Sequence, residues 1–157
     1  PSDKLSKTNK RISDNMKNIK LEEKLPFSSA EIWKVVGNVT RADWVPSVDA
    51  ISLQDSIRIF VMEGVGEIQE EILLCDNKNH RLQYSAIKTP SGIEHHLATI
   101  QLTPIGNSCL FSWTTEIQPD EYAPIIEQGM EVSIEKLKTV LARDTGSAAT
   151  DSEVGEN

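Results

Sequence analysis

Two residues of opposite charge lie among apolar neighbours at a spacing that can place them side by side. A hairpin centred on Gly64 pairs positions whose numbers sum to about 128, so Arg58 faces Glu70 across two antiparallel strands. The same register places Phe60 opposite Ile68. Because buried charges are costly unless they pair, we expect the two charged side chains to form an internal ion pair or a polar anchor for a ligand.

Glu70 and His96 are the candidate catalytic residues. As an anchor, Arg58 would bind a carboxylate or carbonyl oxygen, and Glu70 would orient it or act as a general base. A catalytic carboxylic acid needs a raised pKa, and a neighbouring guanidinium acts in the opposite direction, which favours binding over base catalysis. His96 could donate to a ligand or move a proton, although a single histidine on an apolar strand is usually a satisfied, half-buried side chain. Tyr84 has the same two interpretations.

The histidines and cysteines do not have the spacing of metal ligands. His95 and His96 are neighbours on a strand and therefore point to opposite faces, while Cys75 and Cys109 stand outside any C-x-x-C pattern. The sequence contains neither G-x-G-x-x-G nor G-x-x-x-x-G-K-[ST], the loops that bind phosphates. We therefore expect no metal site, no disulfide framework and no cofactor.

Charge and composition narrow the class of partner. The 157 residues are enough for one domain, and 16 Lys and Arg against 24 Asp and Glu give a net charge of −8. This balance argues against nucleic acid and against anionic lipid headgroups. No apolar run is long enough to span a bilayer and no apolar signal core is present, so we expect no stable membrane insertion and a cytoplasmic location. The oligomeric state stays open, with a homodimer as one alternative.

Hydrophobic periodicity indicates the elements that position these residues. Alternation predicts a strand over 19–25, and a capping box of Ser28 and Glu31 begins a short helix, with a second short helix near 40–44. Apolar residues return at helical spacing over 121–143. Between them, with Gly, Pro and Asn in the turns, strands are expected near 48–54, 56–63, 66–75, 80–88, 93–104 and 107–118.

The short connections between these strands require antiparallel neighbours. We therefore predict an α+β fold, in which a curved antiparallel sheet wraps around a long C-terminal helix and two short helices follow the first strand. The folded domain is expected to span 16–143. The basic segment 1–15 and the acidic segment 144–157 contain few large apolar residues and are expected to be disordered tails.

An ordered series of short motifs runs through this predicted fold. It consists of Ala30-Glu31-Ile32-Trp33, Arg41-Ala42-Asp43-Trp44-Val45-Pro46, Arg58, Gly66, Glu70, Asp76, Leu82, Tyr84, the run from Ala98 to Pro104, and Trp113. In this order the motifs resemble the SRPBCC superfamily of START and birch-pollen-allergen-like proteins, and within it the polyketide cyclase/dehydrase and lipid-transport branch. The resemblance covers about residues 19–142.

The resemblance implies a helix-grip fold with a deep cavity between the sheet and the long helix. Members of the superfamily bind hydrophobic small molecules such as lipids, sterols, quinones, polyketides or plant hormones, and some catalyse cyclisation, dehydration or condensation. Likeness of fold does not identify the ligand of one chain.

The inward faces of the strands and the apolar stripe of the last helix are expected to line this cavity. Trp44 would lie at its mouth, and Gly129 would let a ligand or a strand approach the helix closely. The expected ligand-binding residues are Trp44, Arg58, Phe60, Ile68, Glu70, Tyr84, His96, Ala98, Ile100, Phe111, Trp113, Thr115, Met130 and Ile134.

Three functions remain open at this point. The leading hypothesis is a protein that binds a hydrophobic or amphipathic small molecule, such as a lipid, a quinone or a polyketide-like compound, with its polar end at Arg58, Glu70, Tyr84 and His96. The alternative is a cyclase/dehydratase-type enzyme in which Glu70 or His96 moves a proton and Arg58 or Tyr84 stabilises an enolate. A protein-interaction module that uses the exposed sheet face and the charged tails is the third.

Overall fold

One antiparallel sheet and one long helix make up most of the protein. The computed structural model describes residues 15–146. Its strands are β1 (Lys17–Leu25), β2 (Ile51–Gln54), β3 (Ile57–Met62), β4 (Gly66–Asp76), β5 (Arg81–Lys88), β6 (His95–Ile105) and β7 (Ser108–Gln118). Its helices are α2 (Ser29–Val36), the 3-10 turn η1 (Asp120–Tyr122) and α3 (Ala123–Thr145).

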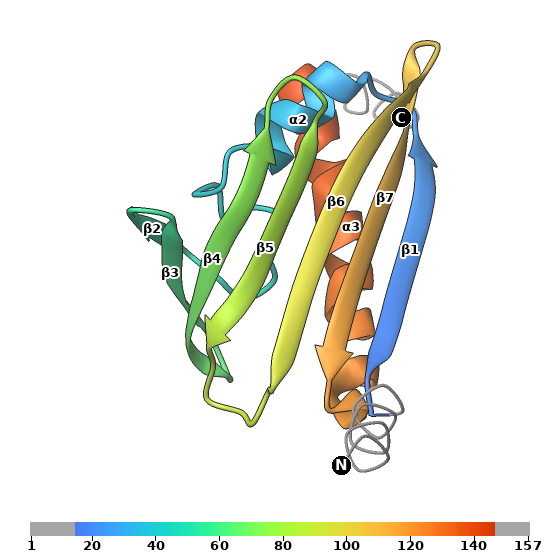
Figure 1. Ribbon diagram of the computed structural model, residues 1–157. Helices are drawn as coiled ribbons and strands as arrows, with labels where there is room; N and C mark the ends of the chain where they lie inside the picture. The colour runs from blue at the N-terminus through green and yellow to red at the C-terminus, as the bar shows by residue number, and fades with distance from the viewer. Residues whose placement is uncertain (1–14, 147–157) are drawn as a thin grey trace, which may run out of the picture.

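The seven strands form a single sheet in the order β1-β7-β6-β5-β4-β3-β2, and each neighbouring pair is antiparallel. From β2 to β7 the chain is a meander, and β1 completes the sheet at the far edge beside β7. Figure 1 shows α3 behind β6 and β7, α2 at one end of the sheet, and β2 and β3 to one side of α3. The predicted combination of a meander sheet and a long C-terminal helix is confirmed.

The register of the β3–β4 hairpin is the predicted one. Arg58 pairs with Glu70 and Phe60 with Ile68. Arg58 and Phe60 are buried, so this face of the hairpin points toward the interior. A slip of β3 by one residue would turn the exposed Val61 inward and the buried Arg58 and Phe60 outward, because side chains alternate between the two faces of a strand.

The core lies between the sheet and α3. Strand β7 shows the alternation most clearly, because each second residue from Cys109 to Ile117 is buried. α3 buries one stripe against this face, made of Ala123, Met130, Ser133, Ile134, Leu137, Val140 and Leu141. The other faces of α3 carry charged residues, and no helix within residues 15–146 is both long and apolar enough to cross a membrane.

The second short helix expected near 40–44 is absent from the structure. Residues 38–48 form turns and bends. The Asn38 side chain accepts hydrogen bonds from the backbone N and the Oγ1 of Thr40, at 3.4 and 3.1 Å, and such local bonds compete with helical pairing. Ser47, with a φ of 63°, reverses the chain before β2. The predicted helical turn is thus replaced by a compact loop.

The C-terminal helix extends past its predicted end. Asp144 and Thr145, expected to belong to a disordered tail, are the last residues of α3. Asp144 pairs with Arg41 at 2.7 Å, and Gly146 ends the helix in the left-handed conformation. The rest of the two expected tails, 1–14 and 147–157, lies outside the described residues.

α2 closes one end of the sheet. The predicted capping box is present: Ser28 N donates to Glu31 Oε1 at 2.9 Å and Glu31 N donates to Ser28 Oγ at 3.1 Å. Trp33 of α2 reaches the β4–β5 turn, where its Nε1 donates to Asn77 Oδ1 at 2.8 Å and its ring stacks on His80 at 5.2 Å between centroids. These contacts hold α2 against the sheet.

Two glycines of this framework have opposite surroundings. A Cβ atom at Gly37, directly after α2, would clash with the Trp33 ring. A Cβ at Gly129 would have no atom within 4 Å. No strand therefore approaches α3 closely at Gly129, and that part of the expectation is wrong.

We predict that Gly37→Ala lowers the free energy of unfolding by about 1–3 kcal/mol, because the new methyl group displaces a buried ring. The matched substitution Gly129→Ala should raise it by up to about 1 kcal/mol through helix propensity. Urea denaturation of both variants measures the two effects. A Gly37→Ala variant as stable as the wild type would contradict the first prediction.

Candidate functional site

Five polar or aromatic residues from five neighbouring strands converge on the inward face of the sheet. They form the inner polar cluster: Arg58 of β3, Glu70 of β4, Tyr84 of β5, His96 of β6 and Trp113 of β7. The register explains the convergence, since Arg58 lies opposite Glu70, and Ala98 pairs with both Tyr84 and Thr115. Sequence reasoning predicted all five as inward-facing.

Arg58 contacts a carboxylate, a backbone carbonyl and an aromatic ring. Its Nε donates to Glu70 Oε1 at 2.7 Å and its Nη1 donates to the carbonyl oxygen of Val39 at 3.2 Å. Its guanidinium carbon lies 4.5 Å from the centre of the Tyr84 ring, a cation–π contact. Arg58 is only 9% exposed. The charge of this buried guanidinium is thus balanced by one carboxylate.

Tyr84 and His96 lie beside this pair with their ring centroids 6.0 Å apart. Burial raises the pKa of Tyr84 far above its ordinary value. Burial also lowers the pKa of His96, although the Glu70 carboxylate opposes the shift. His96 Nδ1 accepts a hydrogen bond from Ala86 N at 2.9 Å, so the neutral ring carries its proton on Nε2. At neutral pH both side chains are therefore uncharged hydrogen-bond donors.

Trp113 supplies a buried donor that has no acceptor. Its side chain is 6% exposed, and its Nε1 makes no hydrogen bond to any residue in the described range 15–146. The indole lies close enough to Tyr84 to oppose the rise in the pKa of that phenol, but it does not reach hydrogen-bonding geometry. Sequence reasoning assigned Trp113 to the apolar wall and missed this N–H, because a strand pattern shows which face a residue occupies and not whether its polar atom finds a partner.

The loop at residues 38–48, here called the cover segment, lies over the inner polar cluster. It contributes the Val39 carbonyl to Arg58, and its Trp44 packs on Trp113 with ring centroids 5.6 Å apart. Ser133 Oγ of α3 donates to the Trp44 carbonyl at 2.7 Å in the buried interior. Trp44, expected at the mouth of a cavity, is therefore a buried link between the sheet and α3.

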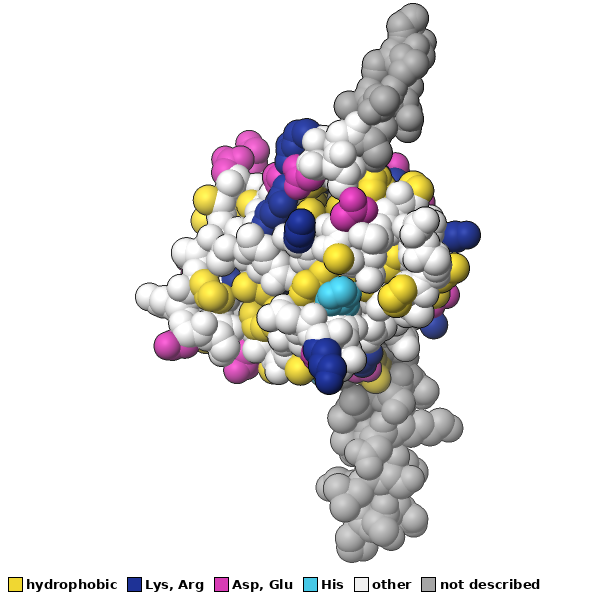
Figure 2. Space-filling model, turned by 90° about the horizontal axis from the view of Figure 1, so that it is seen from above, with side chains coloured by type: hydrophobic (Ala, Val, Ile, Leu, Met, Phe, Trp, Pro, Cys, Tyr) yellow, Lys and Arg dark blue, Asp and Glu magenta, His cyan; other side chains and the backbone are white. Residues whose placement is uncertain are grey.

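Four charged residues tie the cover segment to the end of α3. Arg41 donates to both carboxylate oxygens of Asp43, at 2.8 and 3.0 Å, and to Asp144 at 2.7 Å. Arg143 donates to Asp43 at 2.7 Å. Figure 2 looks onto the α2 end of the molecule, where basic and acidic side chains are intermixed. These ion pairs hold the loop on the helix from outside, as Ser133 does from inside.

The interior beside the inner polar cluster is only partly covered. On the inward face of β4, Ile68 and Ile72 are half-buried, and Leu53 of β2, which pairs with Arg58, is 46% exposed. These strands lie to the side of α3 in Figure 1. Beside the inner polar cluster, these apolar side chains of the inward face therefore keep accessible surface.

The other expected ligand-binding residues lie deeper. Ala98, Ile100 and Phe111 have no accessible surface, and the structure places them in the packed core. Thr115 is buried and its Oγ1 lies 3.4 Å from Met130 Sδ. The space between the sheet and the middle of α3 is thus filled by side chains at this level.

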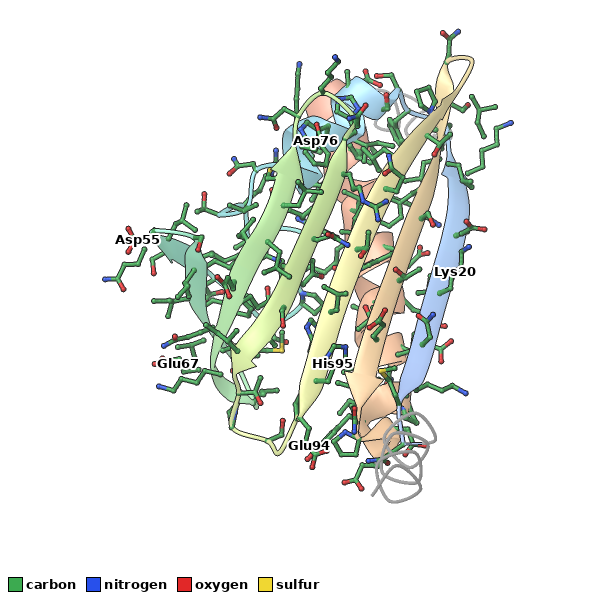
Figure 3. The ribbon with its side chains drawn as sticks, viewed as in Figure 1. Lys20, Asp55, Glu67, Asp76, Glu94 and His95 are labelled. Carbon is green, nitrogen blue, oxygen red and sulfur yellow. The ribbon has the colours of Figure 1, made fainter. Side chains whose placement is uncertain are left out.

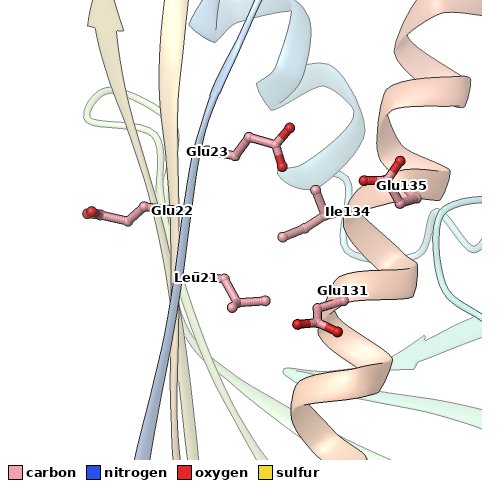
Figure 4. A pocket seen from close by; sticks show the side chains of 6 residues that line it. All are labelled: Leu21, Glu22, Glu23, Glu131, Ile134 and Glu135. Atoms are coloured by element: carbon pink, nitrogen blue, oxygen red, sulfur yellow. The ribbon is translucent and has the colours of Figure 1, made fainter.

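Ile134 is found in a separate groove of about 220 Å³ between β1 and α3. Figure 4 shows Leu21 and Glu23 of β1 facing Ile134, Glu131 and Glu135 of α3, while Glu22 points away. Lys138 pairs with Glu23, and with Glu135 at 2.9 Å. The lining of this groove is therefore mainly acidic.

A second groove, of about 350 Å³, lies on the outer face of the sheet. Its lining comes from three adjacent strands and is mainly polar: Arg81, Gln83, Leu97, Thr99, Gln101, Ser112, Thr114 and Glu116. His95 is on this outer side, where its Nε2 lies 3.0 Å from Glu116 (Figure 3). Among residues 15–146, no three His, Cys, Asp or Glu side chains gather as metal ligands would.

Comparison with protein families identifies the fold. The family model described as polyketide cyclase/dehydrase and lipid transport matches residues 16–150. The chain belongs to this family. The resemblance to the SRPBCC superfamily drawn from the sequence motifs is confirmed, and the sheet with its C-terminal helix is the helix-grip fold of that superfamily. A comparison with curated proteins finds no match.

Solved structures share the family fold at low sequence identity. A protein from Bacillus thuringiensis has a TM-score of 0.72 at 18% identity, over 80% of this chain and 98% of its own. XoxI from Bacillus cereus has the same score and identity, over 79% and 94%. A norcoclaurine synthase point mutant from Thalictrum flavum has a TM-score of 0.66 at 19% identity, over 83% and 96%. At these identities the likeness establishes the fold alone.

The ion pairs of the cover segment predict a dependence of stability on pH. Hydrogen bonds from Arg41 lower the pKa of Asp43 from 3.8 to about 2. A depressed carboxyl pKa stabilises the fold above pH 3.8, and this contribution is lost as the pH falls toward 2. Because the Asp43 side chain is 37% exposed, solvent screening limits the contribution to about 1 kcal/mol.

Asp43→Asn should therefore lower the free energy of unfolding by about 1 kcal/mol at pH 6. The difference in free energy of unfolding between this variant and the wild type should shrink between pH 4 and pH 2. Over this range the wild-type carboxylate takes up a proton and loses its charge, so that position 43 becomes neutral in both proteins. Urea denaturation at pH 6, 4 and 2.5 measures this, with Asp49→Asn on the neighbouring exposed stretch as the control. A constant difference at all three pH values would contradict the prediction.

A second prediction concerns the buried ion pair. Glu70→Gln leaves the Arg58 charge buried without compensation and should cost about 3 kcal/mol of stability. Glu67→Gln, on the same strand but exposed, should cost less than about 0.5 kcal/mol. The double variant Arg58→Met/Glu70→Leu should recover most of the loss, because it removes both charges. If thermal denaturation shows equal effects of Glu70→Gln and Glu67→Gln, the pair does not stabilise the fold.

Proposed function

We propose that this protein binds a hydrophobic or amphipathic small molecule, such as a lipid, a quinone or a polyketide-like compound, with its polar end at the inner polar cluster. The observation that carries the proposal is a group of donors in an apolar interior, one of which, Trp113 Nε1, has no acceptor in the part of the chain that the structure describes. Buried polar groups without partners are rare in folded proteins and mark places where a ligand or water completes the hydrogen bonding.

The surroundings of the inner polar cluster support the same function. Ile68 and Ile72 keep accessible surface on the inward face, and an apolar ligand would remove that surface from water. The family is described by polyketide cyclisation, dehydration and lipid transport, all of which involve largely apolar molecules. Norcoclaurine synthase, which shares the fold, has been solved with dopamine and hydroxybenzaldehyde.

The contacts of Glu70 and His96 favour binding over acid–base catalysis. Glu70 is engaged by Arg58 at 2.7 Å, so its carboxylate already serves as the acceptor for a buried cation. His96 has a lowered pKa and its Nδ1 is already used as an acceptor, which leaves it as a neutral donor. A cyclase/dehydratase activity would need one of these two residues to exchange a proton with the substrate.

We also propose that the protein acts in the cytoplasm and does not bind nucleic acid. Within residues 15–146 the two cysteines, Cys75 and Cys109, are free thiols, as is usual in a reducing compartment. The net charge of −8 disfavours polyanionic partners.

The ligand-binding proposal is tested with the neutral fluorescent probe Nile red. Ile68→Gln places a polar group on the inward face of β4 and should weaken probe binding about tenfold, while Ile59→Gln, on the opposite face of the neighbouring strand, should change it less than twofold. Native mass spectrometry of the purified full chain, before and after organic extraction, should show a bound apolar molecule. Absence of both probe binding and a bound molecule would refute the proposal, and equal binding by the two variants would refute its location.

A further inference from the structure

The inner polar cluster contains a buried hydrogen-bond donor without a partner among residues 15–146. Within residues 15–146 Trp113 Nε1 is a buried donor without an acceptor, and His96, whose Nδ1 accepts from Ala86 N, carries its proton on Nε2. The Tyr84 hydroxyl lies beside Trp113 and Arg58 and stays protonated. The carboxylate of the cluster, Glu70, is bound to Arg58. A ligand that completes these hydrogen bonds must therefore bring an acceptor.

The net charge of the cluster decides which kind of acceptor fits. Arg58 and Glu70 cancel each other at 2.7 Å, while Tyr84 and His96 are neutral at pH 7. A ligand carboxylate would add an unbalanced negative charge near Glu70, in a place where water screens poorly. A carbonyl oxygen accepts the same hydrogen bonds without a net charge. The cluster thus favours a neutral acceptor over an anionic one.

The surroundings of Trp113 place that acceptor at the deep end of the site. Its indole packs against Trp44 at 5.6 Å and against the edge of Phe111 at 6.0 Å, both apolar contacts. Because Nε1 itself has no accessible surface, a ligand oxygen reaches it only after neighbouring side chains shift. The hydrogen bond formed there would be shielded from water, which makes the match of donor and acceptor matter more.

We propose that the polar group of the bound molecule is a neutral carbonyl oxygen, as in a ketone, an ester or a quinone, which accepts from Trp113 Nε1–H and Tyr84 Oη–H, and that the Arg58–Glu70 pair excludes free carboxylic acids. This inference rests on the proposed function, since it specifies the ligand of the same site.

The test compares three probes of equal chain length at pH 7: 2-decanone, decanoic acid and decane. Binding to the full chain is measured by displacement of Nile red. The wild type should bind 2-decanone at least tenfold more tightly than decanoic acid. Trp113→Phe should weaken binding of 2-decanone about 3–10-fold and leave decane unchanged, as expected for the loss of one hydrogen bond. Ser112→Ala, on the outer face next to Trp113, is the control.

Glu70→Gln provides the opposite change. It removes the carboxylate that neutralises Arg58. Decanoic acid should therefore bind this variant at least tenfold more tightly than it binds the wild type, and it should raise the melting temperature of the variant. If Glu70→Gln does not fold, the wild-type comparison and Trp113→Phe still decide the question.

The outcomes separate this inference from the proposed function. If none of the three probes displaces Nile red and Nile red itself does not bind, the proposed function fails. If decanoic acid binds the wild type as tightly as 2-decanone, or if Trp113→Phe leaves 2-decanone binding unchanged while Nile red binds normally, the carbonyl inference is overturned and the proposed function stands.

Discussion

A single helix about 10 Å wide cannot cover seven strands that are spaced about 4.8 Å apart. In this protein α3 covers the part of the sheet formed by β6 and β7, and its apolar stripe packs there against residues with no accessible surface (Figure 1). α3 does not cover the inward face of β2–β4. On that side the interior is completed by the cover segment and by the buried Arg58–Glu70 ion pair. A loop and a pair of charges are both unusual in a protein core.

This arrangement makes the cover segment and the inner polar cluster depend on each other. Arg58 donates to the Val39 carbonyl, and Trp44 packs on Trp113, so the loop is held by the same side chains that it covers. On its outer side the loop is tied to α3 by Arg41 and Asp43. A region closed by a loop and by paired charges opens at a smaller cost than a region closed by a packed helix.

The family and the solved structures account for the fold, whereas the chemistry of the site depends on the side chains of this protein. Proteins with the same helix-grip fold share about a fifth of their residues with it. What distinguishes the site here is local: a guanidinium neutralised at 2.7 Å, a histidine whose Nδ1 is occupied by the Ala86 amide, and an indole N–H without an acceptor. These contacts, and not the architecture, carry the argument for a neutral ligand.

The sequence by itself determined the strand faces, the Arg58–Glu70 pairing and the stripe of α3, because each follows from a short-range period or from a short turn. Only the tertiary structure decided the rest. Arg41 meets Asp144 across 103 residues of chain, and Trp44 joins Ser133 across 89. Periodicity describes which way a side chain points and not which distant atom it meets. For the same reason the unpartnered N–H of Trp113 became visible only when five strands and a loop were placed around it.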